Sequence, residues 1–214
     1  VKNINNNVNW VMYHRGTDAT APQDYWMAFN QDYARQNQPH WNDTAPTSTH
    51  FTVGNDYEIN GPASQSYVAY LFAHDEAAFG YRGNNSIIKC GNYTGNGSSN
   101  GPDINLGWEP QWLLIKRTNA TEDWMLFDHM RTSERQDMWL DDQRPNKTSL
   151  DGDGAGTDSQ PFLNWTSTGF KLSSLSNHTN GNGDNYMYVA VRRPDGYVGE
   201  LPTAGTQVFT PVAD

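Results

Sequence analysis

Residues 112–128 have the sequence WLLIKRTNATEDWMLFD, which is the clearest indication of the fold class in this chain. It holds two short runs of aromatic and branched apolar residues, separated by a polar segment. Such runs, bounded by turn-forming residues, are typical of antiparallel strands. The same pattern recurs in WVMYH, YWMAF, YVAYLFA and YMYVAVRR. The sequence therefore predicts an all-β fold with hairpin connections, and allows at most one short helical turn, at Ser133–Asp142.

Two of these runs are apolar at nearly every position: WLLIK at residues 112–116 and YVAYLFA at residues 67–73. A strand of this kind has both faces covered. The pattern favours central strands of an antiparallel β-sandwich, or strands at a contact between modules. A closed barrel remains an alternative, because short strands alone separate the two architectures poorly.

Two blocks of sequence recur in the same order. Lys2–Trp10 recurs as Lys116–Trp124 at a separation of 114 residues, and Phe51–Tyr67 recurs as Phe170–Tyr186 at a separation of 119 residues. Fixed order with one change of separation is what duplication followed by loop drift leaves behind. The sequence thus predicts one module present twice in tandem.

The two predicted copies differ at their start. Residues 85–110 precede the second copy and have no counterpart before the first. We expect an incomplete first module at residues 1–79, truncated at its N-terminus, and a complete second module at residues 80–194. Residues 195–214 carry Gly and Pro at short intervals and are expected to form an extended arm or linker.

Composition excludes several classes of partner. The formal net charge is −10 and the 14 Lys and Arg residues are scattered, which argues against nucleic-acid binding. The mean hydropathy is −0.81 and no run approaches the roughly 20 apolar residues of a membrane span, which argues against membrane insertion. The single cysteine, Cys90, alternates with Ile88 and is expected to be a small buried core residue.

Several strings resemble a repeated domain of marine bacteriophage virion proteins, especially those of phages of cyanobacteria. They are YVAYLFA followed by FG, NSIIKCGNYTGNGSSNGP, LGWEPQWLLIKR and NGNGDNYMYVAVRRPDG, and the resemblance covers residues 1–208. Members of that family are tandem modules of long structural proteins, described as tail-fibre-like, with concanavalin-like or jelly-roll sandwiches. The resemblance implies a protein of the phage particle that contacts other virion proteins and copies of itself.

A calcium loop is the main metal hypothesis. Asp151, Asp153 and Asp158 lie in the segment DGDGAGTD with part of the spacing of such loops. The EF-hand pattern also needs an acid or amide at Ala155 and a Glu at Phe162, and both are absent. The sequence therefore favours a solvated Gly-rich loop and no cofactor.

The six histidines show no spacing typical of zinc sites. His14 falls in the repeated block at the place where the second copy has Asp128. A polar residue of changing identity favours a surface or edge position for His14.

Paired carboxylates near an aromatic ring raise the alternative of a glycosidase. The candidates are Glu134, Asp137, Asp141 and Asp142, close to Trp139. Such an enzyme needs one acid with a raised pKa and a partner at a set separation, and the sequence indicates neither. A solvated edge is favoured, and we expect the protein not to be an enzyme.

Three tryptophans lie in polar segments and are expected to be exposed ligand-binding residues: Trp41, Trp139 and Trp165. Exposed aromatic rings stack on sugars, and they are also enriched at contacts between subunits. Two functions follow. One is a structural component of the virion, as a tail fibre or capsid decoration. The other is a host-attachment adhesin that binds a cell-surface polysaccharide through repeated weak sites.

Overall fold

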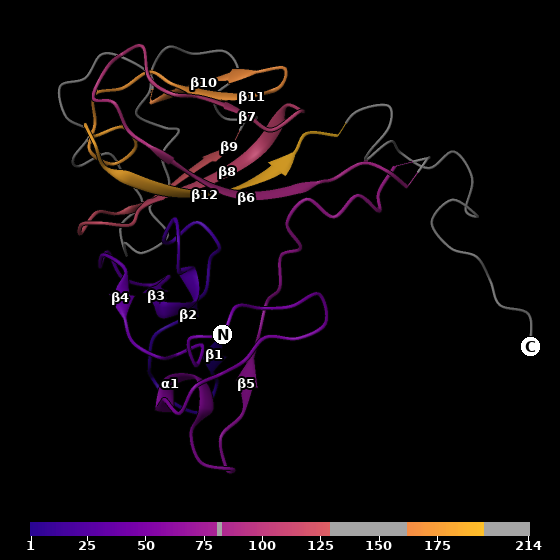
Figure 1. Ribbon diagram of the computed structural model, residues 1–214, viewed down its shortest axis with the longest axis vertical. Helices are drawn as coiled ribbons and strands as arrows, with labels where there is room; N and C mark the ends of the chain where they lie inside the picture. The colour runs from indigo at the N-terminus through magenta and orange to yellow at the C-terminus, as the bar shows by residue number, and fades with distance from the viewer. Residues whose placement is uncertain (81–82, 129–161, 195–214) are drawn as a thin grey trace, which may run out of the picture.

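The computed structural model describes residues 1–80, 83–128 and 162–194 (Figure 1). Antiparallel strands make up nearly all of the regular structure in these residues, so the predicted all-β class is confirmed. Residues 133–142 and 195–214 lie outside the described residues, and the helical turn and arm expected there stay predictions. None of the described helices is long and apolar enough to cross a membrane.

The N-terminal half, residues 1–80, contains short elements. Its strands are β1 (Lys2–Asn3), β2 (Val11–Met12), β3 (Tyr25–Ala28), β4 (Gln36–Asn37) and β5 (Tyr67–Val68). A 3-10 turn, η1 (Pro22–Asp24), precedes β3, and one helical turn, α1 (Tyr57–Asn60), precedes β5. Strands β2, β3 and β4 form one sheet, and β1 pairs with β5.

The C-terminal half, the described residues from 83 onward, contains longer strands. They are β6 (Ile88–Thr94), β7 (Asp103–Asn105), β8 (Pro110–Arg117), β9 (Trp124–Asp128), β10 (Leu163–Thr166), β11 (Gly169–Leu172) and β12 (Asn185–Arg192). A four-stranded sheet has the order β6-β12-β8-β9, and a three-stranded sheet has the order β10-β11-β7. The predicted hairpin at residues 112–128 is strands β8 and β9, which pair from Trp112 with Asp128 to Lys116 with Trp124.

The four-stranded sheet is covered on both faces. The three-stranded sheet lies over one face, and the N-terminal half lies against the other (Figure 1). Leu113 and Ile115 belong to the apolar cluster between the two sheets, whereas Trp112 and Leu114 belong to the cluster that contains Met27 of the N-terminal half. The expectation that residues 112–116 are covered on both faces is therefore confirmed.

The N-terminal half has a core of its own. Val11, Trp26, Ala28, Trp41 and Ile59 form it, and Tyr13 packs against it. Cys90 lies in the cluster at the contact between the halves and is 7% exposed, so its predicted burial is confirmed. Burial raises the pKa of the Cys90 thiol to about 11, which keeps it protonated and unreactive.

The pairing of β1 in the N-terminal half has the register of β8 in the C-terminal half. Lys2 pairs with Val68 and Asn3 with Tyr67. The residues at the corresponding positions, separated by 114 and 119 residues, pair in the same way: Lys116 with Met187 and Arg117 with Tyr186. Val1 and Val11 exchange two backbone hydrogen bonds, and their counterparts Ile115 and Met125 are also paired.

The turns before β5 and β12 share side-chain hydrogen bonds as well. The Tyr67 hydroxyl accepts from the Gly61 amide at 2.6 Å and donates to a carbonyl oxygen at 3.1 Å. The Tyr186 hydroxyl accepts from the Gly181 amide at 2.7 Å and likewise donates to a carbonyl oxygen, at 2.6 Å. Each of these tyrosines therefore anchors the turn that leads into its strand.

Candidate functional site

The predicted ligand-binding tryptophans are placed differently from one another. Trp41 is only 3% exposed, so the expectation that it is exposed is wrong. Its indole N–H donates to the Tyr25 carbonyl oxygen, and the Tyr13 ring meets it edge-on. Trp165 lies on β10, half-buried against the core between the sheets. Trp139 lies outside the described residues, as do Asp151, Asp153 and Asp158.

His14 is buried, so the expected surface position is also wrong. Its Nδ1 accepts a hydrogen bond from the Gly16 amide at 2.9 Å, which leaves the proton on Nε2. Nε2 then donates to the Tyr188 carbonyl oxygen at 3.0 Å, on strand β12 of the other half. Burial is the main cause that lowers the pKa of His14 to about 4. The imidazole is therefore a neutral structural link between the halves.

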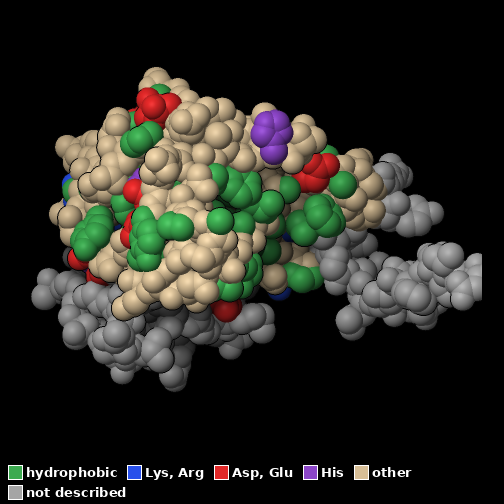
Figure 2. Space-filling model, turned by 90° about the horizontal axis from the view of Figure 1, so that it is seen from below, with side chains coloured by type: hydrophobic (Ala, Val, Ile, Leu, Met, Phe, Trp, Pro, Cys, Tyr) green, Lys and Arg blue, Asp and Glu red, His purple; other side chains and the backbone are tan. Residues whose placement is uncertain are grey.

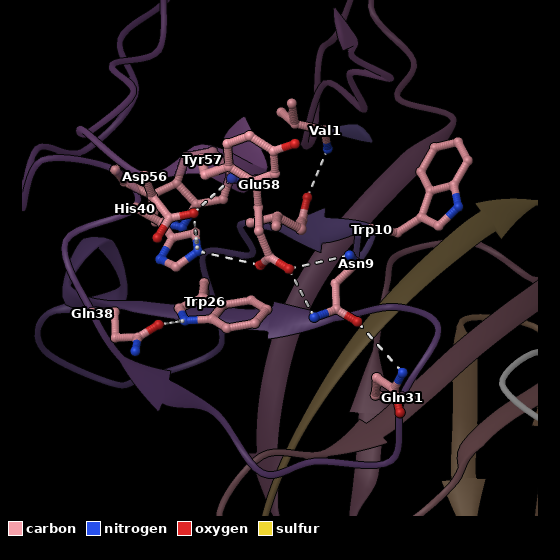
Figure 3. Close-up of polar contacts among 12 residues, drawn as sticks. Val1, Asn9, Trp10, Trp26, Gln31, Gln38, His40, Asp56, Tyr57 and Glu58 are labelled. Carbon is pink, nitrogen blue, oxygen red and sulfur yellow. Dashed lines mark hydrogen bonds and ion pairs between the residues drawn. The ribbon is translucent and has the colours of Figure 1, made fainter. Parts of the chain in front are cut away.

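A cluster of three potential metal ligands lies in the N-terminal half, formed by His40, Asp56 and Glu58 (Figure 3). The His40 side chain is 2% exposed, whereas Asp56 is 40% exposed and Glu58 21% exposed. His40 Nε2 lies 3.5 Å from Asp56 Oδ1 and 3.7 Å from Glu58 Oε2. The ligand atoms of all three lie within 4.8 Å of one another.

Neighbouring residues fix the orientation of these side chains. The His40 ring stacks on Trp26 with ring centroids 4.4 Å apart. Glu58 Oε1 accepts from the backbone amide and the side-chain amide of Asn9, which leaves Oε2 facing His40. Asp56 caps α1, because its Oδ1 accepts from the Glu58 amide at 2.8 Å. Figure 3 shows the three side chains pointing toward one another.

The protonation of His40 depends on two opposing influences. Burial lowers the pKa of His40 from its ordinary value, and the nearby carboxylates of Asp56 and Glu58 oppose this shift. The imidazole is thereby held toward its neutral form. A neutral ring has one nitrogen with a free lone pair, which is the form that binds metal ions.

A glycine brings the two ligand-bearing segments together. The Gly54 amide donates to the His40 carbonyl oxygen at 2.6 Å, and Asn60 Nδ2 donates to the Gly54 carbonyl oxygen at 2.9 Å. A Cβ atom at residue 54 would lie 1.8 Å from the Pro39 carbonyl oxygen. Only a residue without a side chain allows this approach.

We expect Gly54→Ala to lower the free energy of unfolding by about 2 kcal/mol, since the added methyl group forces the two segments apart. The backbone at residue 54 does not adopt a positive φ, so the effect is steric. Denaturant unfolding followed by circular dichroism measures the loss. An unchanged midpoint would contradict the close approach.

An exposed apolar segment follows β5. Tyr70, Leu71 and Phe72 are 67%, 77% and 59% exposed. Within the described part of the chain, the backbone of residues 69–73 makes no hydrogen bond, because β5 ends at Val68. The chain then runs up the outside of the molecule to β6 (Figure 1). Figure 2 shows hydrophobic side chains on the face seen from below, where the N-terminal half lies.

The corresponding segment of the C-terminal half is paired with a strand on each side. Residues 188–192 lie in β12, which pairs with β6 on one side and with β8 on the other. The expectation that YVAYLFA is covered on both faces is therefore wrong for residues 69–73. Residues 69–73 form no strand in the structure, but they continue β5 along the chain and have the sequence pattern of β12, so we call them the open strand.

Comparison with known protein families identifies the family of the chain. Residues 1–193 match a family described as a domain of unknown function, DUF7483. The chain belongs to the DUF7483 family. The matched region spans both halves. No curated protein and no solved structure matches the chain.

In this DUF7483 chain, sequence reasoning missed the His40 cluster. The ligands come from the loop that holds His40 and from the helical turn α1 with its N-cap, and no motif spacing joins His40 to Asp56. The repeat gave no signal either, because at its separation of 119 residues Leu175 and Asn177 correspond to Asp56 and Glu58. The capping hydrogen bonds of the structure instead place Ser176 and His178 at the positions of the two acids.

Proposed function

We propose that this chain is a non-enzymatic structural component of a bacteriophage particle, located in the virion and built of two tandem β-sandwich modules. In this proposal the first module joins a neighbouring subunit through the open strand. Duplication is supported by the shared registers of β1 with β5 and of β8 with β12. The shared tyrosine hydrogen bonds of the two turns support it independently.

The open strand is the observation that carries the assembly proposal. Its sequence is apolar at successive positions, as expected for a strand with neighbours, yet Leu71 is 77% exposed. An unpaired apolar strand is a template for pairing with another chain. Because its counterpart β12 is flanked by β6 and β8, the partner we propose is a strand of another copy of the same module.

The assignment to a phage particle rests on the resemblance of the sequence to repeated virion domains. A tail fibre or a decoration of the capsid surface fits this resemblance. Both are built from many copies of a subunit, and symmetric assemblies of this kind reuse one contact surface. The partners we propose are therefore other virion proteins and copies of this chain, without substrate turnover, nucleic acid or membrane insertion.

The adhesin alternative has less support. It depends on exposed tryptophan rings that stack on sugars. Trp41 is buried and Trp165 is half-buried, so the side chains of both are less exposed than those of the open strand. Binding of a host-surface glycan stays a prediction that depends chiefly on Trp139.

We expect Leu71→Lys to weaken self-association of the chain by at least about tenfold, because a charge on an exposed strand opposes edge pairing. Sedimentation velocity over a series of protein concentrations measures the association. Folding should be unaffected, since Leu71 is 77% exposed and leaves no cavity when replaced.

Leu175→Lys is the matched control. Leu175 is 58% exposed, follows β11 in the C-terminal half and is not part of the open strand. Its substitution should leave association unchanged. Two results would overturn the proposal: a wild-type chain that is monomeric at every concentration, or equal effects of the two substitutions.

A further inference from the structure

The His40 cluster is independent of the open strand and has an unexplained feature of its own. Both ring nitrogens of His40 are buried, and neither has a hydrogen-bond partner. Buried polar side-chain atoms are nearly always hydrogen-bonded or coordinated to an ion. The imidazole lies at ion-pair distance from two carboxylates but too far from either for a normal hydrogen bond, so a ligand between them would account for this arrangement.

The distances between these atoms suit a shared metal ion better than hydrogen bonds. Ring N–H groups donate to oxygen at about 2.7–3.2 Å. The separations from His40 Nε2 are 3.5 Å to Asp56 and 3.7 Å to Glu58. A tetrahedral ion with bonds of about 2.1 Å places its ligand atoms about 3.4 Å apart. Small side-chain adjustments would therefore complete a coordination site.

The charge of the cluster points to a cation. Asp56 and Glu58 lie on one short turn and face the same point. Among the described residues, no Lys or Arg pairs with either carboxylate; their only ion-pairing neighbour is His40. Burial favours the neutral form of His40, so two negative charges lack a permanent positive partner.

The turn itself does not require this pair of acids. In the corresponding turn of the C-terminal half, Ser176 Oγ accepts the capping hydrogen bond from the His178 amide at 3.2 Å. The Asn60 and Asn180 side chains donate in the same way to the carbonyl oxygens of Gly54 and Ser174, each at 2.9 Å. The same turn therefore forms with serine and histidine at the places of the acids.

The ligand types define the ion. Calcium and magnesium prefer six or more oxygen ligands, whereas imidazole with carboxylates suits zinc and its neighbours in the first transition series. We propose that His40, Asp56 and Glu58 bind one divalent transition-metal ion of the zinc class. The exposed side of Asp56 gives the ion a path from solvent and leaves room for a water ligand.

Such an ion would link the loop at residues 39–41 to the turn at α1. Both segments pack on the core of the N-terminal half through Trp41 and Ile59. Because metal binding to the folded state adds to stability, the ion would strengthen the smaller half of the molecule.

Zinc titration of the chain, freed of metal by a chelator, tests the proposal. Isothermal titration calorimetry should show one tight site. At a zinc concentration 100 times the dissociation constant, the thermal midpoint should rise by about 5–10 °C. Cobalt should bind in competition with zinc and give visible d–d absorption, which reports the coordination geometry directly.

Two substitutions preserve the shape of the site. Glu58→Gln keeps an oxygen for Asn9, and Asp56→Asn keeps a good helix cap. Each should weaken zinc binding by at least about tenfold, since even groups behind metal ligands contribute that much. His178→Gln is the matched control, because it removes a histidine next to Glu122 from the corresponding turn. It should leave affinity unchanged.

The proposal fails if zinc produces neither heat nor a change in thermal midpoint. It also fails if one-site binding persists unchanged in both Glu58→Gln and Asp56→Asn, or if His178→Gln weakens binding as much as they do. These outcomes are separate from the association of subunits, since Leu71→Lys leaves the three ligands intact.

Discussion

Trp124→Ala should lower the free energy of unfolding by about 4 kcal/mol. The Trp124 side chain has no exposed surface and lies in the cluster between the two halves. Its ring meets Phe29 at a centroid distance of 5.0 Å. Its indole N–H donates to the Gln31 carbonyl oxygen at 2.9 Å. The substitution therefore creates a large cavity and removes a buried donor at the same contact.

Trp10→Ala provides the matched comparison, because Trp10 occupies the corresponding place in the repeat. Trp10 is half-buried, and its ring has a tilted contact with the exposed Tyr70 at 6.0 Å. We expect a loss of about 1 kcal/mol or less. Urea unfolding followed by far-ultraviolet circular dichroism measures the free energy of unfolding of both variants without relying on tryptophan fluorescence. Equal losses would contradict the difference in packing between the halves.

The hairpin at residues 112–128 could be predicted because its continuously apolar sequence matches the burial of its first strand on both faces. Leu113 and Ile115 face one apolar cluster, and Trp112 and Leu114 face another. Burial on both faces is what a continuously apolar strand indicates. The repeated blocks contain equivalent strand pairs, since β1 with β5 has the register of β8 with β12, although the sequence alone did not show which strands pair.

The surroundings of the open strand could not be predicted in the same way. An apolar run shows that a segment can be buried, but burial also needs neighbouring strands to cover it. Residues 69–73 have the pattern of β12 without strands in the places of β6 and β8. The pattern is a property of the segment, whereas its exposure depends on the rest of the sheet.

Trp41 and His14 show why neighbouring polarity is a weak guide to burial. Trp41 lies next to Asn42 and Asp43, which are exposed, while its own ring turns inward onto Tyr13. His14 has an exposed neighbour in Arg15 and is itself buried. In irregular segments, successive side chains point in different directions, and sequence alone does not show which one faces the core.

Lowering the pH from 7 to about 4.5 should reduce the free energy of unfolding of the wild-type protein more than it reduces that of the His14→Gln variant. The folded-state pKa of His14 is about 4, below its ordinary value of 6.5. Between these pH values the unfolded chain binds more protons than the folded chain. His14 therefore contributes about 3 kcal/mol to the free energy of unfolding. This contribution is fully present above about pH 6.5 and is lost as the pH falls toward 4.

The loss has a structural cause in the contact between the halves. A protonated His14 would place a charge in a buried site, and its Nδ1 could no longer accept from Gly16. His14→Gln removes the titrating group while its amide can still donate to Tyr188. Denaturant unfolding at both pH values measures the difference for each variant. The exposed His50 serves as the control, and His50→Gln should retain the full wild-type pH dependence. If His14→Gln loses as much stability as the wild type on acidification, the histidine link between the halves is not what makes the fold sensitive to acid.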